Sequence, residues 1–258
     1  MKDPTIYNVR ALERAILILS CFNDDNPERG VAEIARLVGL HRATAHRIVV
    51  TLLNGGYLER ASDGERYRLG LRLVEMGLAV LRRLDFRREA LPYMQALQER
   101  FGETCDLSVF SSGEVLYLEV VQSRHALQIA ARPGQRLPAY CTASGKVFLA
   151  LLSPDEVARV LSVPLRRHTD NTVTSPARIA EQLERVRACG YGFDDGEYEV
   201  GVRAVAAPVR DNTGKVVAVI SMPGPAARMD AERVAEIAAA LIAATDGISA
   251  HMGWQRNR

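Results

Sequence analysis

The sequence predicts a multi-domain protein with a small, helix-rich N-terminal domain that carries a β-hairpin, a helical linker, and a larger α+β C-terminal domain. Three observations support this prediction. Residues 10–56 contain three short amphipathic helical patterns separated by Gly-containing breaks. Apolar residues then recur at helical spacing through residues 70–101. Beyond them, strand patterns and helical patterns are mixed along the chain, as is typical of helices packed against a sheet.

The composition is that of an ordinary soluble globular protein, with 48% hydrophobic and 25% charged residues in 258. No apolar run reaches about 18 residues, so we expect no membrane span. The opening segment, MKDPTIYNVR, lacks the apolar core of a signal peptide, and we expect a cytoplasmic protein. The four cysteines are widely spaced, which argues against a disulfide framework and a zinc site. We predict neither a metal nor a cofactor.

The N-terminal domain begins with RALERAILILSCF, which places Leu12, Ile16 and Leu19 on one helical face. The turn-rich segment NDDNPERG follows. The next pattern, VAEIARLVGL, ends at Gly39, a residue type common just past a helix end. The chain then resumes as RATAHRIVVTLLNGG. The other residues predicted to face inward are Ile34, Leu37, Val38, Ala45, Ile48 and Leu52.

Two short helices joined by a tight turn, with small Ala35 and Ala45 near their crossing, are typical of a helix-turn-helix. In this motif the second helix enters the DNA major groove with its N-terminal residues toward base edges. The outward polar residues at that place, which suit base or phosphate contacts, are His41, Arg42, Thr44, His46 and Arg47. The pattern therefore predicts binding to double-stranded DNA.

A hairpin wing is predicted after these helices, because YLER and RYRLG alternate around the turn signal SDG. Arg60, Arg66 and Arg68 in this wing are candidate phosphate contacts. The charge distribution agrees: residues 1–88 carry 15 Lys and Arg against 11 Asp and Glu, a net of +4. Residues 89–258 carry 18 against 20, a net of −2. A basic N-terminal part fits a nucleic-acid-binding module.

The rest of the chain predicts a linker and an α+β domain. We expect helix from about residue 70 to 101, with Pro92 starting a second helix and a domain boundary near residue 85. DLSVFSSGEVLYLEVVQ predicts a hairpin, ALQIAAR (126–132) a further strand, and GVRAVAAPVRDNTGKVVAVISM two strands. SPDEVARVL carries a capping box that starts at Ser153. SPARIAEQLERVRACG and DAERVAEIAAALIAATDGISAHM predict two more helices.

A candidate ligand site lies in YCTASGKVF, where the chain enters a helix through the small residues Thr142, Ala143, Ser144 and Gly145. Small residues let a ligand approach the backbone closely. Free N–H groups at a helix start favour an anion such as a carboxylate. The alternative is a tight loop whose small residues serve packing.

Several segments together resemble the IclR-type bacterial transcriptional regulators. LERAILIL, VAEIARLVGLHRATAHRIVVTLLNGGYLER and YRLGLRLVEMG resemble the family's winged helix-turn-helix. GQRLPAYCTASGKVFLALL and GYGFDDGEYEVGVRAVAAPVRDNTGKVVAVISMPGP resemble two parts of its effector domain. The resemblance covers about residues 7 to 250, and two independent motif sets occur in the expected order.

The resemblance implies a winged helix-turn-helix at residues 1–70, a linker helix at residues 71–88 and a GAF-like effector-binding domain at residues 89–258. It implies a homodimer formed through the N-terminal domains, or a tetramer, on a palindromic or repeated operator. A small organic acid or aromatic metabolite would change that binding, in a repressor or an activator. The linker residues that would offer a dimer surface are Leu71, Val74, Leu78 and Leu81.

The family's effector pocket can be carried over residue by residue. The matching positions, with Leu127 as an apolar wall, are Leu127, Ala143, Ser144, Asp194, Ala204 and Ser221. The chain departs from the family pattern at Ala204, where many members have Cys, at Gly196 and at Pro223. These changes remove polar contacts, so the effector's identity does not transfer. RLPAYCTASGK also resembles the aromatic-acid-responsive branch, in which Arg136 would hold a carboxylate and Tyr140 would pack on a ring.

Isolated Cys and His residues leave two alternative functions, an enzyme and a redox sensor. An enzyme would need Cys141 as nucleophile with His125, His168 and Asp170 as base and orienting groups, and nothing in the spacing brings these together. A redox sensor would need an exposed thiolate of lowered pKa at Cys105 or Cys141. The expectation is therefore a non-enzymatic regulator.

Overall fold

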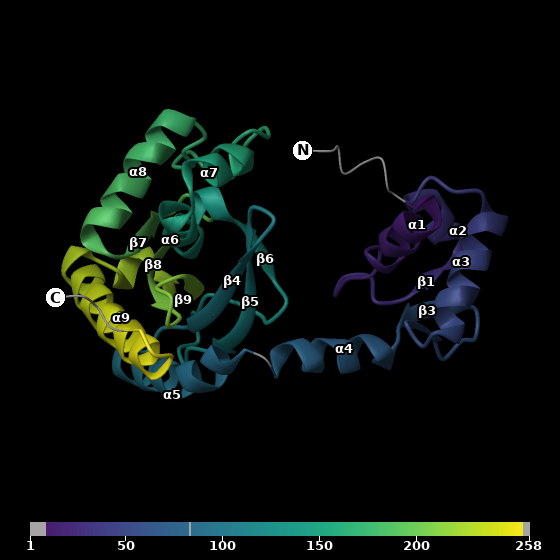
Figure 1. Cartoon of the computed structure of the whole chain (residues 1–258), viewed down its shortest axis with the longest axis horizontal. Helices are drawn as coiled ribbons and strands as arrows, with labels where there is room; N and C mark the ends of the chain where they lie inside the picture. Colours follow the sequence, from purple (N-terminus) through teal and green to yellow (C-terminus); the bar gives the residue numbers. More distant parts are fainter. Residues whose placement is uncertain (1–8, 83, 255–258) are drawn as a thin grey trace. The chain divides into compact units, whose positions relative to one another are not determined.

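The computed structural model describes residues 9–82 and 84–254. Contacts divide the chain into two compact units, Met1–Arg83 and Leu84–Arg258 (Figure 1). The first unit is small and mainly helical. The second unit holds a six-stranded sheet covered by helices on both faces.

The first unit contains the predicted helix-turn-helix and wing. Its elements are α1 (Arg10–Leu19), β1 (Arg29–Gly30), α2 (Val31–Leu37), α3 (Arg42–Asn54), β2 (Leu58–Arg60), β3 (Arg66–Leu69) and α4 (Leu71–Leu81). The three strands form an antiparallel sheet in the order β1-β3-β2. The segment before α2 thus pairs with the wing, which ties the wing to the two helices.

The turn between α2 and α3 explains why glycine follows α2. Gly39 has a φ of 64°, a left-handed conformation that glycine adopts without steric cost. The amide of Leu40 donates to the carbonyl of Ala35 at 2.9 Å, and that of Gly39 donates to Arg36 at 3.4 Å. This is the Schellman pattern, which bonds the last carbonyls of a helix and reverses the chain. It sets the angle at which α3 leaves α2.

The core of the first unit contradicts part of the predicted inward face. Ile18, Ile34, Val49, Leu58 and Tyr67 are buried in one cluster. Three residues predicted to face inward are instead exposed, namely Leu12 and Ile16 at 64% and Leu37 at 51%. The sequence pattern predicts which residues share an apolar helix face. It does not distinguish an apolar face that packs inside the unit from one that stays exposed on its surface.

The linker prediction is wrong about where the helix breaks. Helix α4 ends at Leu81 and α5 (Asp85–Phe101) begins well before Pro92, which lies inside α5. Proline removes one backbone donor and leaves the carbonyl four residues earlier, at Arg88, without its helical partner. Pro92 and Arg88 are both exposed, so water can reach that carbonyl. The interior proline is therefore tolerated.

The second unit is built on one antiparallel sheet with strand order β6-β5-β4-β9-β8-β7. Its strands are β4 (Cys105–Ser111), β5 (Glu114–Val121), β6 (Arg136–Pro138), β7 (Gly192–Asp195), β8 (Val202–Arg210) and β9 (Val216–Pro225). Its further helices are α6 (Ala143–Leu151), α7 (Pro154–Val160), α8 (Pro176–Cys189) and α9 (Ala231–His251), with short 3-10 turns at Ala139–Cys141 and Ala226–Arg228. The predicted capping box at Ser153 is present.

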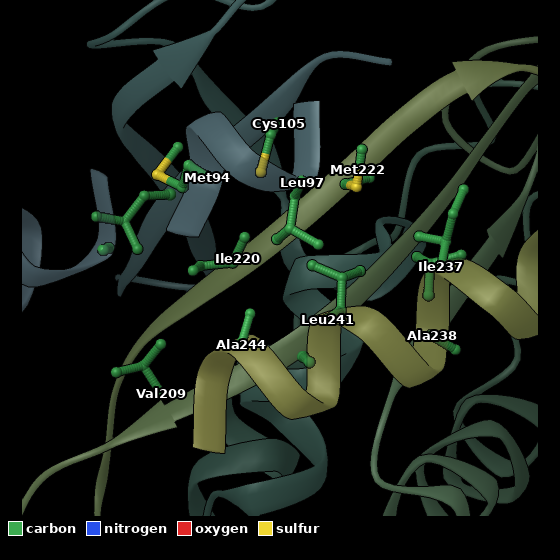
Figure 2. Close-up of a cluster of buried hydrophobic side chains, with 14 of the residues drawn as sticks. Met94, Leu97, Cys105, Val209, Ile220, Met222, Ile237, Ala238, Leu241 and Ala244 are labelled. Atoms are coloured by element: carbon green, nitrogen blue, oxygen red, sulfur yellow. The ribbon is translucent and has the colours of Figure 1, made fainter. Parts of the chain in front are cut away.

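Side-chain alternation along the strands divides this unit into two cores. Ile220 and Met222 of β9 face α5 and α9, where Figure 2 shows them packed among side chains of both helices. Val219 belongs to the other core, beside α6 and α8. Ser221 alternates to that same side. Helix α9 is long and apolar enough to span a membrane by composition, but its apolar side chains fill the first core.

The β4–β5 hairpin is confirmed, whereas the strand predicted at residues 126–132 is wrong. The hairpin turns at Ser112 and Gly113, with φ values of 56° and 83°, as a tight turn of positive φ requires. Residues 126–132 form neither helix nor strand. Their backbone is held by side chains instead: Thr104 donates to the carbonyl of Ile129 at 3.2 Å, and Gln122 donates to that of Ala131 at 2.6 Å.

Candidate functional site

The first candidate site is the outward face of α3. Arg42, His46 and Arg47 are exposed and Thr44 is half-buried, as the prediction requires. Neither arginine forms an ion pair with a carboxylate in the part of the chain that the structure describes. A guanidinium without a protein partner has all its donors available for guanine edges or phosphate oxygens.

His41 has a second role that the sequence pattern did not reveal. It is the N-cap residue of α3, and its Nδ1 accepts a hydrogen bond from the amide of Ala43 at 3.3 Å. An accepting Nδ1 leaves Nε2 as the protonated nitrogen of the neutral ring. His41 therefore caps the helix while it offers a donor at the end that a DNA-reading helix presents to the bases.

The wing arginines differ from those on α3 because each already has a partner. Arg66 pairs with Asp63 at 2.6 Å and with Glu28 at 3.0 Å. Hydrogen bonds from the backbone amide and the side chain of Arg66, joined by the amide of Glu65, lower the pKa of Asp63 to about 2. Asp63 is therefore ionised at neutral pH. Arg66 would have to break its ion pair with Asp63 to bind a phosphate.

The other two predicted wing contacts are engaged in the same way. Arg68 reaches Glu59 at 3.4 Å. Arg60 donates to the carbonyl of Gly64 at 2.6 Å and lies 5.3 Å from the ring centre of Tyr67. These bonds order the hairpin, so part of the wing's positive charge is already used within the protein.

The second candidate site is a cavity in the second unit, on the side of the sheet that faces α6. Its free volume is about 570 Å³ including the open mouth. The start of α6, the strands β5, β7, β8 and β9, and the segment before β6 enclose it. The lining residues are Tyr117, Ile129, Ala130, Ala131, Gln135, Leu137, Thr142, Ala143, Ser144, Asp194, Tyr198, Glu199, Val202, Ala204, Ser221 and Pro223.

Five of the six residues carried over by resemblance meet in this cavity, and one does not. Leu127 is 68% exposed and does not line the cavity. The apolar wall is formed two to four residues later, by Ile129, Ala130 and Ala131. The prediction placed the wall on a strand, whereas the segment is irregular and turns a different part of itself inward.

Arg136 and Tyr140 are also outside the cavity. Arg136 pairs with Glu114 at 2.7 Å on the exposed edge of the sheet. The hydroxyl of Tyr140 donates to the carbonyl of Arg166 at 2.5 Å. Neither side chain is therefore placed to hold a carboxylate or pack on a ring in this cavity. The tyrosines that line it are Tyr117 and Tyr198.

Close packing holds the start of α6 at the cavity. Thr142 caps the helix, and its hydroxyl accepts from the amide of Gly145 at 3.3 Å. A Cβ on Gly145 would lie 2.2 Å from Ala139, and one on Gly192 would lie 2.3 Å from the carbonyl of Ala143. Only glycine allows these approaches. The amides of Ala143 and Ser144, which have no acceptor in their own helix, are thereby kept beside the cavity.

Asp106 lies behind the cavity wall, although the sequence analysis did not select it. It is fully buried on β4 opposite Ser221, whose hydroxyl donates to Oδ2 at 2.7 Å. Oδ1 has no partner among the described residues. Burial raises the pKa of Asp106 to about 7, partly offset by the bond from Ser221. Because Ser221 donates inward, its lone pairs are the groups left for a ligand.

Asp194 is a second buried carboxyl, on the cavity itself. Burial raises its pKa to about 7, against the opposing charge of Lys146 and a hydrogen bond from the amide of Glu197 at 2.8 Å. Lys146, only 2% exposed, pairs with Glu197 and donates to the carbonyl of Phe193 at 2.9 Å. This buried pair ties α6 to the loop after β7, which also lines the cavity.

Comparison with known proteins identifies the family. Residues 78–250 match the family described as bacterial transcriptional regulator IclR C-terminal, and residues 11–62 match the IclR helix-turn-helix domain. The chain belongs to the IclR family. It is accordingly a DNA-binding transcriptional regulator.

Relatives match over nearly their whole length. The chain is 34% identical to the HTH-type transcriptional regulator KdgR of Escherichia coli, over 96% of this chain and 94% of that protein. It is 30% identical to the transcriptional repressor IclR of the same species, over 98% and 93%. Among solved structures, an IclR homologue from Microbacterium hydrocarbonoxydans complexed with 4-hydroxybenzoate has a TM-score of 0.83 and 34% identity, covering 94% of this chain and 98% of that one.

The cysteine-based alternatives lose support within this IclR-family structure. Cys105 and Cys141 are buried, and burial raises the pKa of Cys141 to about 12 and that of Cys105 well above its usual value. A sensor thiol needs the opposite shift. No hydrogen bond joins Cys141 to His125 or His168 within residues 84–254.

Several residues in or behind the wall of the cavity were not predicted from the sequence, although some left a signal. Lys146 interrupts ASGKVFLAL, a helix otherwise apolar or small all round, and such a lysine needs a buried partner. Asp106 occupies an inward position of an apolar strand. Tyr117 and Tyr198 left no comparable signal, because aromatic residues are common in strands and loops.

Proposed function

We propose that this IclR-family regulator reads its operator with α3 and that a small organic acid in the cavity beside α6 changes the binding. The observation that carries the proposal is the pair of sites: a polar helix face whose arginines lack protein partners, and a cavity that combines free helix amides with the buried carboxyl of Asp194. The residues proposed for DNA contact are Arg42, Thr44, His46, Arg47 and His41, with the wing residues Arg60, Arg66 and Arg68 on the backbone. Those proposed for the effector are Ala143, Ser144, Asp194, Ala204 and Ser221.

The cavity chemistry favours a carboxylate with a compact body. The amides of Ala143 and Ser144 suit an anionic oxygen. Asp194, with its pKa raised to about 7, can hold a proton and share it with a ligand oxygen. Ser221 accepts a donor such as a ligand hydroxyl. The walls from Tyr117 and Ile129 are apolar. A hydroxylated aromatic or aliphatic acid fits this set, and the Microbacterium relative holds 4-hydroxybenzoate.

We further propose a homodimer, or a tetramer built from it, on a palindromic or repeated operator. Exposed apolar side chains line α1 and α4, which has no buried residue of its own in the single chain. Those side chains are Leu12, Ile16, Leu71, Val74, Met76, Leu78 and Val80. A two-fold pair of reading helices matches half-sites one helical turn apart, about 34 Å. Replacing Val74 and Leu78 by Glu should reduce the mass in light scattering to that of a monomer.

The remaining expectations follow from this function. A chromosomal regulator works in the cytoplasm, and it needs neither a cofactor nor a catalytic step. The sign of control depends on where the operator lies relative to its promoter. Both repression and activation are compatible with the same two sites.

The decisive experiment selects genomic DNA fragments with the purified protein at physiological salt, and then titrates small organic acids against the enriched operator. Recurrent symmetric or repeated sites, released or bound more tightly by one acid, support the proposal. Ser144→Trp and Ala204→Met should abolish the acid's effect while operator affinity and Tm stay near wild type. A normal acid response in both variants would place the effector elsewhere. Typical coupling free energies of about 1–3 kcal/mol predict a change of roughly 5- to 150-fold.

A further inference from the structure

The second unit has another hollow that shares no lining residue with the cavity. It lies between the tip of the β4–β5 hairpin, α7 and the segment 163–168, and its free volume is about 1,420 Å³ including the open mouth. We call it the α7 groove. Its lining residues are Phe110, Ser112, Gly113, Glu114, Pro138, Tyr140, Leu152, Glu156, Arg159, Val160, Val163, Pro164, Leu165, Arg166 and His168.

The α7 groove has apolar walls. Phe110, Leu152, Val160 and Leu165 are partly buried side chains that pack against the core beneath α6. Val163, in contrast, is 59% exposed at the rim. A surface hollow lined in this way favours an apolar occupant.

The charged side chains of the groove differ in whether they already have a partner within the protein. Glu114 is already paired with Arg136, and Glu156 accepts from the amide and hydroxyl of Ser153 at 3.0 and 2.7 Å. Arg159 and Arg166 are exposed, and neither forms an ion pair within the described residues. The carboxylates are held by protein donors, while both guanidinium groups keep donors for something else. The groove therefore complements an anion.

An aromatic contact runs from the groove to the effector cavity. The rings of Tyr140 and His168, which line the groove, lie with centroids 6.3 Å apart. His168 in turn lies 5.0 Å from the ring of Tyr198, which lines the cavity. Tyr140 is also bonded through its hydroxyl to the carbonyl of Arg166. A ligand that moves Arg166 would therefore act on a contact that ends at the cavity wall.

We propose that the α7 groove binds a second small molecule, an apolar organic anion, separate from the effector, and that the Tyr140–His168–Tyr198 contact couples the two sites. The apolar walls take the body of the ligand, and Arg159 and Arg166 take its carboxylate or sulfonate. Binding at the groove stands on these contacts alone. The coupling rests on the proposed function of the cavity.

The test uses two dyes with the full-length protein. 8-Anilinonaphthalene-1-sulfonate has an apolar body and one sulfonate, and N-phenyl-1-naphthylamine has nearly the same rings without charge. Fluorescence titration should give one sulfonate-dye site per chain, and weaker binding of the neutral dye. Arg166→Glu or Arg159→Glu should lower the affinity for the sulfonate dye about tenfold, because losing a charge-assisted hydrogen bond of about 1.4 kcal/mol corresponds to that factor.

Two control variants separate the groove from other sites. Arg178→Glu changes an exposed arginine of α8 outside the groove and should leave dye binding unchanged. Ala204→Met fills the effector cavity and should still bind one dye per chain. Dye binding lost in Ala204→Met but kept in Arg166→Glu would assign the dye to the cavity and overturn the proposal. Equal binding in all variants, no binding, or a signal that appears only when the oligomer dissociates would also overturn it.

Hydrogen exchange tests the coupling without a known effector. The sulfonate dye should slow amide exchange in residues 196–201, the loop that carries Tyr198, and Arg166→Glu should remove this protection. Dye binding with no change in that loop would leave the groove as a binding site but overturn its coupling to the cavity. Failure of the effector proposal would show instead in the operator titration, so the two failures are distinguishable.

Discussion

The arginines of α3 and the lysine of α6 show two opposite uses of positive charge. Arg42 and Arg47 are exposed and lack carboxylate partners within the described residues, whereas Lys146 is buried against Glu197. The first unit also leaves apolar faces of α1 and α4 uncovered, while the second unit encloses two apolar cores. The first unit thus presents unpaired positive charge and apolar side chains at its surface. The second unit pairs its buried charge internally and leaves two hollows, the cavity and the α7 groove, open at its surface.

Removing the buried cation should have the largest effect. In Lys146→Met, Glu197 stays buried without its charge partner, and such losses cost about 3–5 kcal/mol. Urea unfolding should record this loss of stability. The control is Arg72→Met, which breaks the exposed pair with Glu75 and should cost far less stability, because solvent screens that pair. Similar losses in both variants would remove the contrast between buried and exposed charge.

The buried carboxyl of Asp106 should make stability fall as pH rises. Its pKa of about 7 lies above the value of about 3.9 for an unfolded aspartate, so the folded protein binds more protons between those pH values. Stability is therefore lost from about pH 4 to pH 7, by up to about 4 kcal/mol for this group. Asp194 contributes with the same sign. Asp106→Asn should roughly halve the slope of unfolding free energy against pH.

Asp63→Asn is the control for this pH dependence, because the pKa of Asp63 is lowered to about 2. Its contribution is present above the unfolded pKa and is lost as pH falls toward 2. The Asp63→Asn protein should keep the wild-type slope between pH 4.5 and 8. Parallel curves for Asp106→Asn and wild type in that range would show that Asp106 does not hold a proton in the folded state.

On the DNA side, Arg47→Ala should weaken operator binding by about 1–3 kcal/mol if the free guanidinium contacts a base, with a smaller loss on random DNA. Fluorescence anisotropy with both DNAs at fixed salt measures the difference. An equal loss on both would assign Arg47 to a phosphate.

The smallest effect is expected in the wing. Arg66→Ala removes a side chain that is already bonded to Asp63 and Glu28. In the wild type, the free energy of a phosphate contact by Arg66 is partly offset by the loss of those two ion pairs. We expect a smaller loss of DNA affinity than for Arg47→Ala, equal on operator and random DNA. A loss as large as that of Arg47→Ala would mean that the wing releases its partners when it meets DNA.

The local sequence pattern was sufficient to predict most helices and strands. It was insufficient where contacts between residues distant in sequence determine the structure. The helix-turn-helix, the β4–β5 hairpin and the capping box at Ser153 depend on residues close in sequence, and they are confirmed. Pro92 and residues 126–132 were misread because solvent exposure and side-chain bonds from distant residues override local preference there.

The candidate cavity was predictable only through family resemblance. Spacing alone indicated the start of α6, but not that Asp194, Ala204 and Ser221 converge on it from three strands. Such convergence depends on strand order, which a single sequence does not contain. Asp106 illustrates the same limit, because its importance comes from the Ser221 that lies opposite it on β9.

The irregular wall of the cavity has a consequence for how the shape of the cavity can change during evolution. Ile129 and Ala131 are held by their backbone carbonyls, through Thr104 and Gln122, and their side chains take no part in those bonds. Exchanging these side chains would reshape the cavity while the anchoring bonds and the sheet persist. If the cavity holds the effector, as proposed, paralogues that diverge after gene duplication can change the metabolite they sense through a few substitutions in this one segment, while the rest of the domain keeps its structure.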